Sequence, residues 1–218
     1  MVFIIGENHF WETWMWRYIK DKSVVGLRGG STISYLVSYI KESKLDVKIV
    51  TPSCETEKLC RENNLKVLET SSVNELSVAF DGCDEVDYNL NALKSCGGIH
   101  TKEKIVATMA KDYILLVDES KVSETLQFKY PVVLEIVPES KSLVEKRVKQ
   151  LGGQVNMRND ILMEAKFDLE YVKNIDKLDE DLKKIIGVID TSLFYNIATK
   201  AIVVGKDWVK LMECEKGA

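Results

Sequence analysis

The sequence predicts an α/β fold, with a doubly wound, Rossmann-like, mainly parallel sheet and a second, smaller α+β lid domain. Short runs of β-branched residues alternate with segments whose apolar residues recur every three to four positions. The run 113–118 is apolar almost throughout, which is typical of a strand covered on both faces. The 218 residues, of which 45% are hydrophobic, are enough for a packed core.

The first part of the chain predicts a series of βα units. The expected strands are 23–27, 46–51, 65–69 and 76–82, and the expected helices are 33–44 and 55–64. In the first helix, apolar residues share one face at i, i+3, i+4 and i+7, namely Ile33, Leu36, Val37 and Ile40. Strands that alternate with helices require right-handed crossovers, so the sheet should be mainly parallel.

The next helix is expected to begin at Thr101, whose hydroxyl can cap it, with Ile105, Met109 and Ala110 facing inward. The strand 113–120 follows this helix. This layer therefore ends near residue 125.

The remainder predicts a second unit, with strands 130–138, 161–167 and 199–205 and helices 140–153 and 176–187. Gly152 and Gly153 end the first of these helices. We expect a small α+β lid domain at 130–205 and a Rossmann-like catalytic domain at 1–129 and 206–218. The last strand candidate, 207–214, is expected to return to the first sheet.

Composition excludes several classes of function. The chain carries 30 basic and 34 acidic residues, a net charge of -4, so no overall positive field points to a nucleic acid partner. No segment reaches the roughly 18 apolar residues of a membrane span. The five cysteines are odd in number and form no C-x-x-C pair, which indicates a cytoplasmic protein without a disulfide framework or a clustered zinc site. With only two histidines, any general base is expected to be a carboxylate.

Three segments could carry chemistry, and the first is the loop 26–32 between a strand and a helix. Its glycines allow close approach of the backbone, and N–H groups at a helix N-terminus beside Ser31 and Thr32 suit a phosphate. A tight turn with Ser31 or Thr32 as N-cap explains the same residues, so both interpretations stay open. The loop lacks the P-loop ending and the dinucleotide glycine pattern.

The second segment is the acidic string 81–87, which contains Asp81 and Asp84 and directly follows an expected strand. Carboxylates beyond the carboxyl end of a parallel strand lie where α/β sheets bind ligands. A solvated acidic turn is the simpler interpretation of the string by itself.

The third segment, 94–104, places a Gly97-Gly98 turn between Lys94 and Glu103. This turn could bring a cation and a carboxylate to one site. Equally, Glu103 in the first helical turn suits the helix dipole without any function, and Lys94 could be exposed.

In this order, the three segments resemble the type A ribose-5-phosphate isomerases. The resemblance covers about 23–205 and extends to Asp118-x-Ser120-Lys121, the strand around 131–138, Leu151-Gly152-Gly153 with Arg158 after it, and Gly187-Val188 leading to Leu193-Phe194. It implies an enzyme of the non-oxidative pentose phosphate pathway that interconverts ribose 5-phosphate and ribulose 5-phosphate through an enediolate. It also implies no metal or other cofactor, a phosphorylated pentose as substrate, and a homodimer or homotetramer.

The resemblance also implies residue roles. Glu103 would be the general base, and Asp81, Asp84 and Lys94 would supply the ring-opening and electrophilic group. The substrate would contact Arg28, Gly30, Ser31, Thr32, Gly97, Gly98 and Lys121. One carboxylate can carry a proton between neighbouring carbons, and a lysine can stabilise the enediolate charge.

The loop departs from the family's usual Gly-Thr-Gly-Ser-Thr, because Arg28 and Gly29 replace the first Gly and the Thr. Arg28 either binds a phosphate oxygen or obstructs the phosphate site. Cys96 and His100 are further additions near the expected site. Two alternatives remain, an isomerase of another sugar phosphate and a non-catalytic sugar-phosphate sensor, although a sensor would not need both Glu103 and Lys94.

Overall fold

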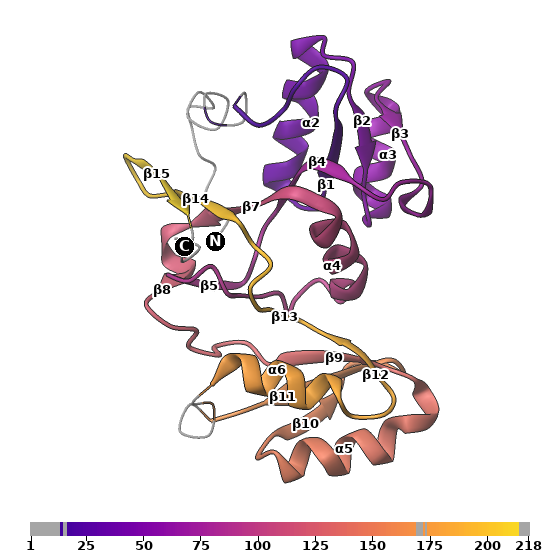
Figure 1. The fold of residues 1–218 in the computed structure, drawn as a ribbon, viewed down its shortest axis with the longest axis vertical. Helices are drawn as coiled ribbons and strands as arrows, with labels where there is room; N and C mark the ends of the chain where they lie inside the picture. Colours follow the sequence, from indigo (N-terminus) through magenta and orange to yellow (C-terminus); the bar gives the residue numbers. More distant parts are fainter. Residues whose placement is uncertain (1–13, 15–16, 169–171, 173, 214–218) are drawn as a thin grey trace.

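The computed structural model describes residue 14, residues 17–168, residue 172 and residues 174–213, which form three sheets (Figure 1). The largest has seven strands in the order β15-β14-β7-β4-β1-β2-β3, and only β15 runs antiparallel to its neighbour. These strands are β1 (Val24–Leu27), β2 (Lys48–Val50), β3 (Lys66–Val67), β4 (Leu76–Asp81), β7 (Ala110–Asp118), β14 (Lys200–Val204) and β15 (Val209–Glu213). The predicted α/β class with a mainly parallel central sheet is confirmed.

Helices cover both faces of this sheet. Helices α2 (Ser31–Ser43) and α3 (Cys54–Glu62) pack on one face, and α4 (His100–Met109) packs on the other. Gly26 in β1 allows α4 to approach, because a Cβ at Gly26 would lie 2.7 Å from the Cβ of Ala79 and 2.8 Å from Cγ1 of Val106. The helix that carries Glu103 therefore lies directly against the strands β1 and β4.

The start of α4 differs from the prediction. The helix begins at His100 with Ile99 as N-cap, so Thr101 does not cap it. Ile105 is 47% exposed, whereas the polar residues His100, Glu103 and Lys104 are buried. The prediction that Ile105 faces inward was wrong, because it assumed that only apolar residues would lie on the buried face.

The second sheet has the order β10-β11-β9-β12 and is antiparallel. It contains β9 (Val132–Ile136), β10 (Gln154–Met157), β11 (Leu162–Lys166) and β12 (Val188–Thr191), with helices α5 (Lys141–Gln150) and α6 (Ile175–Lys183) beside it (Figure 1). Strand β14, which the sequence pattern placed with this smaller unit, instead pairs with β7 in the large sheet. The division into two domains stays a prediction, and its ends at 1–13 and 214–218 lie outside the described residues.

The third sheet is small, with the order β13-β6-β5-β8, and was not predicted. It consists of β5 (Glu85–Asp87), β6 (Ala92–Leu93), β8 (Val122–Ser123) and β13 (Leu193–Phe194), and short 3₁₀ turns occupy Thr70–Ser72, Glu119–Lys121 and Pro138–Ser140. Strand β5 contains part of the acidic string, and its carboxylates are buried: Glu85 accepts from the backbone of Gln127 and Tyr130, and Asp87 from that of Asn91. The interpretation of this string as a solvated turn was therefore wrong.

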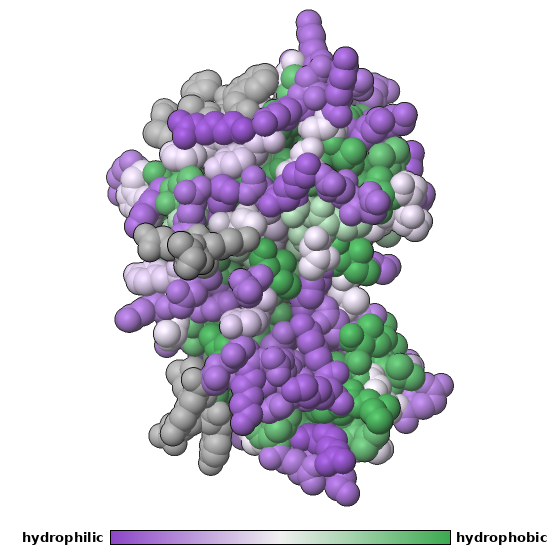
Figure 2. Space-filling model, viewed as in Figure 1, coloured by the Kyte–Doolittle hydropathy of each residue, from purple (hydrophilic) through white to green (hydrophobic). Residues whose placement is uncertain are grey.

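In the lower part of the view in Figure 2, hydrophobic residues gather mainly at the right, beside a strongly hydrophilic patch. Exposed apolar side chains near the second sheet include Val137, Leu143, Ile186 and Ile189. Within the described ranges, no helix is both long enough and apolar enough to cross a membrane.

Candidate active site

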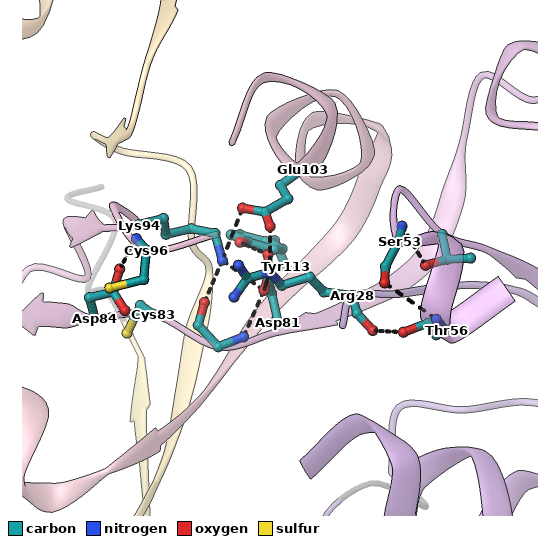
Figure 3. A network of polar contacts seen from close by, with 12 residues as sticks. Arg28, Ser53, Thr56, Asp81, Cys83, Asp84, Lys94, Cys96, Glu103 and Tyr113 are labelled. Atoms are coloured by element: carbon teal, nitrogen blue, oxygen red, sulfur yellow. Dashed lines mark hydrogen bonds and ion pairs between the residues drawn. The ribbon is translucent and has the colours of Figure 1, made fainter. Parts of the chain in front are cut away.

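Four charged side chains meet beyond the carboxyl ends of β1 and β4 (Figure 3). Arg28 follows β1, Asp81 is the last residue of β4, Lys94 follows β6, and Glu103 lies in the first turn of α4. Parallel sheets bind their ligands at this edge. The fold thus joins residues as far apart as Arg28 and Glu103, which are 75 positions apart in the sequence.

Lys94 lies at the centre of this cluster. Its Nζ is 2.7 Å from Oδ1 of Asp81 and 3.4 Å from Oε2 of Glu103, and it donates to the carbonyl oxygen of Gly82. The side chain of Lys94 is 0% exposed, and those of Asp81 and Glu103 are 4% and 1% exposed. A buried ammonium group requires such partners, because an unpaired buried charge is strongly destabilising. The possibility that Lys94 is simply an exposed residue is excluded.

Arg28 is the second cation of the cluster. Its Nε donates to Oε1 of Glu103 and lies 3.3 Å from Oδ1 of Asp81. Its backbone is fixed by Thr56, whose hydroxyl donates to the Arg28 carbonyl oxygen across 2.8 Å, while Ser53 caps α3 by accepting from the Thr56 N–H. In this structure, the partners of the guanidinium group are therefore carboxylates.

Glu103 is buried, and one of its two oxygens accepts no hydrogen bond from the described residues. Burial raises the pKa of its carboxyl above the ordinary value, Lys94 and Arg28 lower it in part, and the charge of Asp81 raises it. Among the described residues, none donates a hydrogen bond to Oε2. A carboxylate with a raised pKa and an oxygen that accepts no hydrogen bond has the properties of a general base.

Tyr113 belongs to the same site, although sequence reasoning missed it. Its hydroxyl donates to Oδ2 of Asp81 across 2.7 Å, and the residue is buried in β7. Burial and the nearby charge of Asp81 raise the pKa of the phenol well above its ordinary value, so it remains a donor. A signal was present, since a tyrosine in a strand covered on both faces must find a partner for its hydroxyl.

Asp84 and Lys121 lie beside the cluster, and each forms a hydrogen bond with a backbone group of a nearby cysteine. Asp84 accepts from the N–H of Cys96 across 2.9 Å, and Lys121 donates to the carbonyl oxygen of Cys83 across 2.9 Å. Figure 3 shows Asp84, Cys83 and Cys96 next to one another on the Lys94 side of the site. These residues border the four charges without joining them.

The glycines of the site have specific conformations or contacts. A Cβ on Gly97 would lie 2.2 Å from Nη2 of Arg28, and Gly98 has a φ of +68°. Gly30, with a φ of +122°, is the N-cap of α2, so the interpretation of Ser31 or Thr32 as the N-cap was wrong. Thr32 is exposed, and the side chain of Ser31 lies outside what the structure describes.

Helix α4 is also tied to the second sheet by buried polar contacts. Nζ of Lys104 lies 2.8 Å from Oδ1 of Asp190 and donates to the carbonyl oxygen of Thr191 across 2.7 Å. His100, one turn before Lys104, is buried with its Nε2 3.4 Å from the carbonyl oxygen of Asp190. These contacts fix the helix that carries Glu103 between the two sheets.

The fold and this site define an α/β protein with a buried lysine and a buried carboxylate at the carboxyl edge of a parallel sheet, a pair suited to proton transfer beside a carbonyl. Residues 48–208 match the family model described as ribose 5-phosphate isomerase A (phosphoriboisomerase A). The chain belongs to this family, as the motifs predicted.

Similar proteins cover nearly the whole chain. A protein of Streptococcus pneumoniae (strain ATCC 700669 / Spain 23F-1) named ribose-5-phosphate isomerase A is 36% identical over 92% of this chain and 93% of its own. Its namesake in Streptococcus thermophilus (strain LMD-9) is 37% identical over 90% and 92%. The crystal structure of ribose 5 phosphate isomerase A from Neisseria gonorrhoeae has a TM-score of 0.85 and 25% identity, covering 93% of this chain and 94% of its own. A D-ribose-5-phosphate isomerase in complex with phospho-erythronic acid has a TM-score of 0.83 and 29% identity over 93% and 95%.

Proposed function

We propose that this chain interconverts ribose 5-phosphate and ribulose 5-phosphate, with Glu103 as the base that carries the proton. The observation that carries this proposal is the position of Glu103: its Oε2 is buried, accepts no hydrogen bond from any described residue and lies 3.4 Å from Nζ of Lys94. A base and a cation at this spacing can share one substrate, the base at a C–H group and the cation at the adjacent oxygen. The family and its named relatives support the choice of substrate.

In the proposed reaction, Glu103 removes the proton from C2 of the open-chain aldose. The electrons of that C–H bond form the C1–C2 double bond, and the aldehyde oxygen gains the negative charge, which Lys94 stabilises. Glu103 then delivers its proton to C1, while the hydroxyl proton on O2 is transferred to O1. Atoms and charge balance, and the product is the 2-ketose.

Asp81 and Asp84 have different tasks in this scheme. Asp81 accepts from Tyr113 on one oxygen and from Lys94 and the N–H of Gly82 on the other, so we assign it to holding Lys94 in place. Asp84 is less buried and bonds to Cys96, so we assign it to the proton exchange of ring opening.

The phosphate of the substrate would be bound at the N-terminus of α2 by the loop 30–32, where the helix dipole favours an anion. Gly97, Gly98 and Lys121 would contact the rest of the substrate. A homodimer or homotetramer is proposed from the family resemblance.

Glu103→Gln tests this proposal, with Glu57→Gln on α3 as the matched control, because Glu57 is an exposed partner of Arg61. Both variants and the parent chain are assayed for conversion of pentose and hexose phosphates, and their folding is checked by thermal unfolding. We expect the parent and Glu57→Gln to convert ribose 5-phosphate, and Glu103→Gln to lose about a hundredfold or more in kcat. A parent chain that binds the sugar phosphates and converts none of them would be a sensor, and full activity of Glu103→Gln would remove Glu103 as the base.

A further inference from the structure

Arg28 contacts the carboxylate that we assign as the base, yet the proposed reaction gives Arg28 no task. Its Nε donates to Oε1 of Glu103, and its side chain is 21% exposed, whereas those of its partners Glu103 and Asp81 are 1% and 4% exposed. Thr56 holds its backbone from the neighbouring helix α3. Hydrogen bonds therefore hold both the guanidinium group and the backbone of Arg28.

We propose that Arg28 is a positioning residue that holds Oε1 of Glu103, keeps the carboxylate ionised and leaves Oε2 as the oxygen that takes the substrate proton. The inference rests on the proposed function, because it assumes that Glu103 is the base. Its geometric basis is the division of the two oxygens: Oε1 accepts from Arg28, and Oε2 accepts no hydrogen bond from any described residue.

The charge balance of the site gives Arg28 a second effect. The groups that face Glu103 are Arg28 from the loop after β1, Asp81 of β4, Lys94 after β6 and Tyr113 of β7. With Arg28 present, the charges of two cations offset those of the two carboxylates, Asp81 and Glu103. Without it, Lys94 alone would face both Asp81 and Glu103 in a buried site, where ionising a second carboxyl is costly.

The expected direction follows from this balance. The pKa of Glu103 is already raised by burial, and loss of the arginine charge raises it further. A general base acts only when ionised, so kcat/KM falls as the pH drops through this pKa. Neutralising Arg28 should therefore move the acidic limb of the kcat/KM profile to higher pH.

Gly97 provides an independent way to disturb the same contact. A Cβ at Gly97 would lie 2.2 Å from Nη2 of Arg28, so Gly97→Ala must displace the guanidinium group. Because the arginine is the nearest obstacle, the combination of Gly97→Ala with Arg28→Gly should add little to Arg28→Gly alone. This non-additivity would show that the two residues act through one contact.

The experiment compares kcat/KM against pH for the parent chain and for Arg28→Met, Arg28→Lys and Gly97→Ala. Arg61→Met is the matched control, since Arg61 forms an exposed ion pair with Glu57 on α3. In Arg28→Met and Gly97→Ala, we expect the acidic limb of the kcat/KM profile to lie about one pH unit higher than in the parent chain. The limb of Arg28→Lys should shift less, and that of Arg61→Met should coincide with the parent's. An acidic limb of Arg28→Met or Gly97→Ala that coincides with the parent's would overturn the inference.

A second readout does not depend on activity. The δ-carbon of Glu103 is titrated by carbon-13 NMR, with its signal assigned by its absence in Glu103→Gln. A higher pKa in Arg28→Met than in the parent supports the inference, and equal values overturn it. If Arg28→Met does not fold, Arg28→Lys and Gly97→Ala are titrated instead. Full activity of Glu103→Gln would instead refute the proposed function, so the two failures can be told apart.

Discussion

The hydroxyl of Tyr113 donates to Oδ2 of Asp81 across 2.7 Å, while Nζ of Lys94 lies 2.7 Å from Oδ1 of the same carboxylate. Both oxygens of Asp81 are thus engaged by buried donors that come from β7 and from the segment after β6. A carboxylate bound in this way is a fixed anchor for the lysine. The lysine that we propose as the electrophile is therefore held in place by the sheet itself.

Tyr113→Phe should loosen this anchor without removing a charge. A hydrogen bond to a charged group contributes about 1.5–3 kcal/mol, and we expect the free energy of unfolding to fall by about that amount. We also expect a clear loss of kcat, because Lys94 is then held less firmly. Urea unfolding and steady-state kinetics measure the two effects. Tyr130→Phe is the control, since Tyr130 is 41% exposed, and equal behaviour of the two variants would count against the anchor.

Lys94→Met should be more severe, because it leaves two buried carboxylates with Arg28 as the remaining cation of the cluster. Removing one partner of a buried ion pair typically costs about 3–5 kcal/mol. We expect unfolding at lower urea and no measurable isomerisation. Adding Asp81→Asn should restore part of the stability and none of the activity. Recovery of activity in the double variant would refute Lys94 as the electrophile.

The cysteines offer a test of where the substrate lies. Burial raises the pKa of the Cys83 thiol to about 12 and that of Cys60 to about 11, whereas Cys54 and Cys96 are exposed. The thiolate is the reactive form, so iodoacetamide at pH 8 should label Cys54, label Cys96 more slowly because burial and Asp84 raise the pKa of its thiol, and spare Cys60 and Cys83 until the chain unfolds. Because Cys96 bonds to Asp84, ribose 5-phosphate should slow its labelling and leave Cys54 unchanged. Peptide mass mapping measures the labelling of each cysteine. If ribose 5-phosphate protects Cys54 and Cys96 equally, the substrate lies elsewhere.

Much of the fold could be predicted from local pattern. The strands that became β1, β4 and β7 and the helices α2, α3 and α5 were expected within a few residues of their bounds, because buried faces leave a period in the sequence. Strands β5, β6 and β13 have only two or three residues and, unlike the equally short β2 and β3, do not directly follow a predicted helix, so no local pattern marked them.

The sequence by itself determined the family and indicated the charged residues of the site. It did so because the loop 26–32, the acidic string and the segment 94–104 follow one another in the order that is typical of the family. Only the tertiary structure decided which atoms meet. In the tertiary structure Arg28 donates to Glu103, Tyr113 donates to Asp81, and β14 pairs with β7. The physical reason is that periodicity in the sequence shows only which face of a helix or strand is buried. The contact between Arg28 and Glu103, 75 positions apart, depends on how closely α4 packs on β1, and Gly26 allows that close packing.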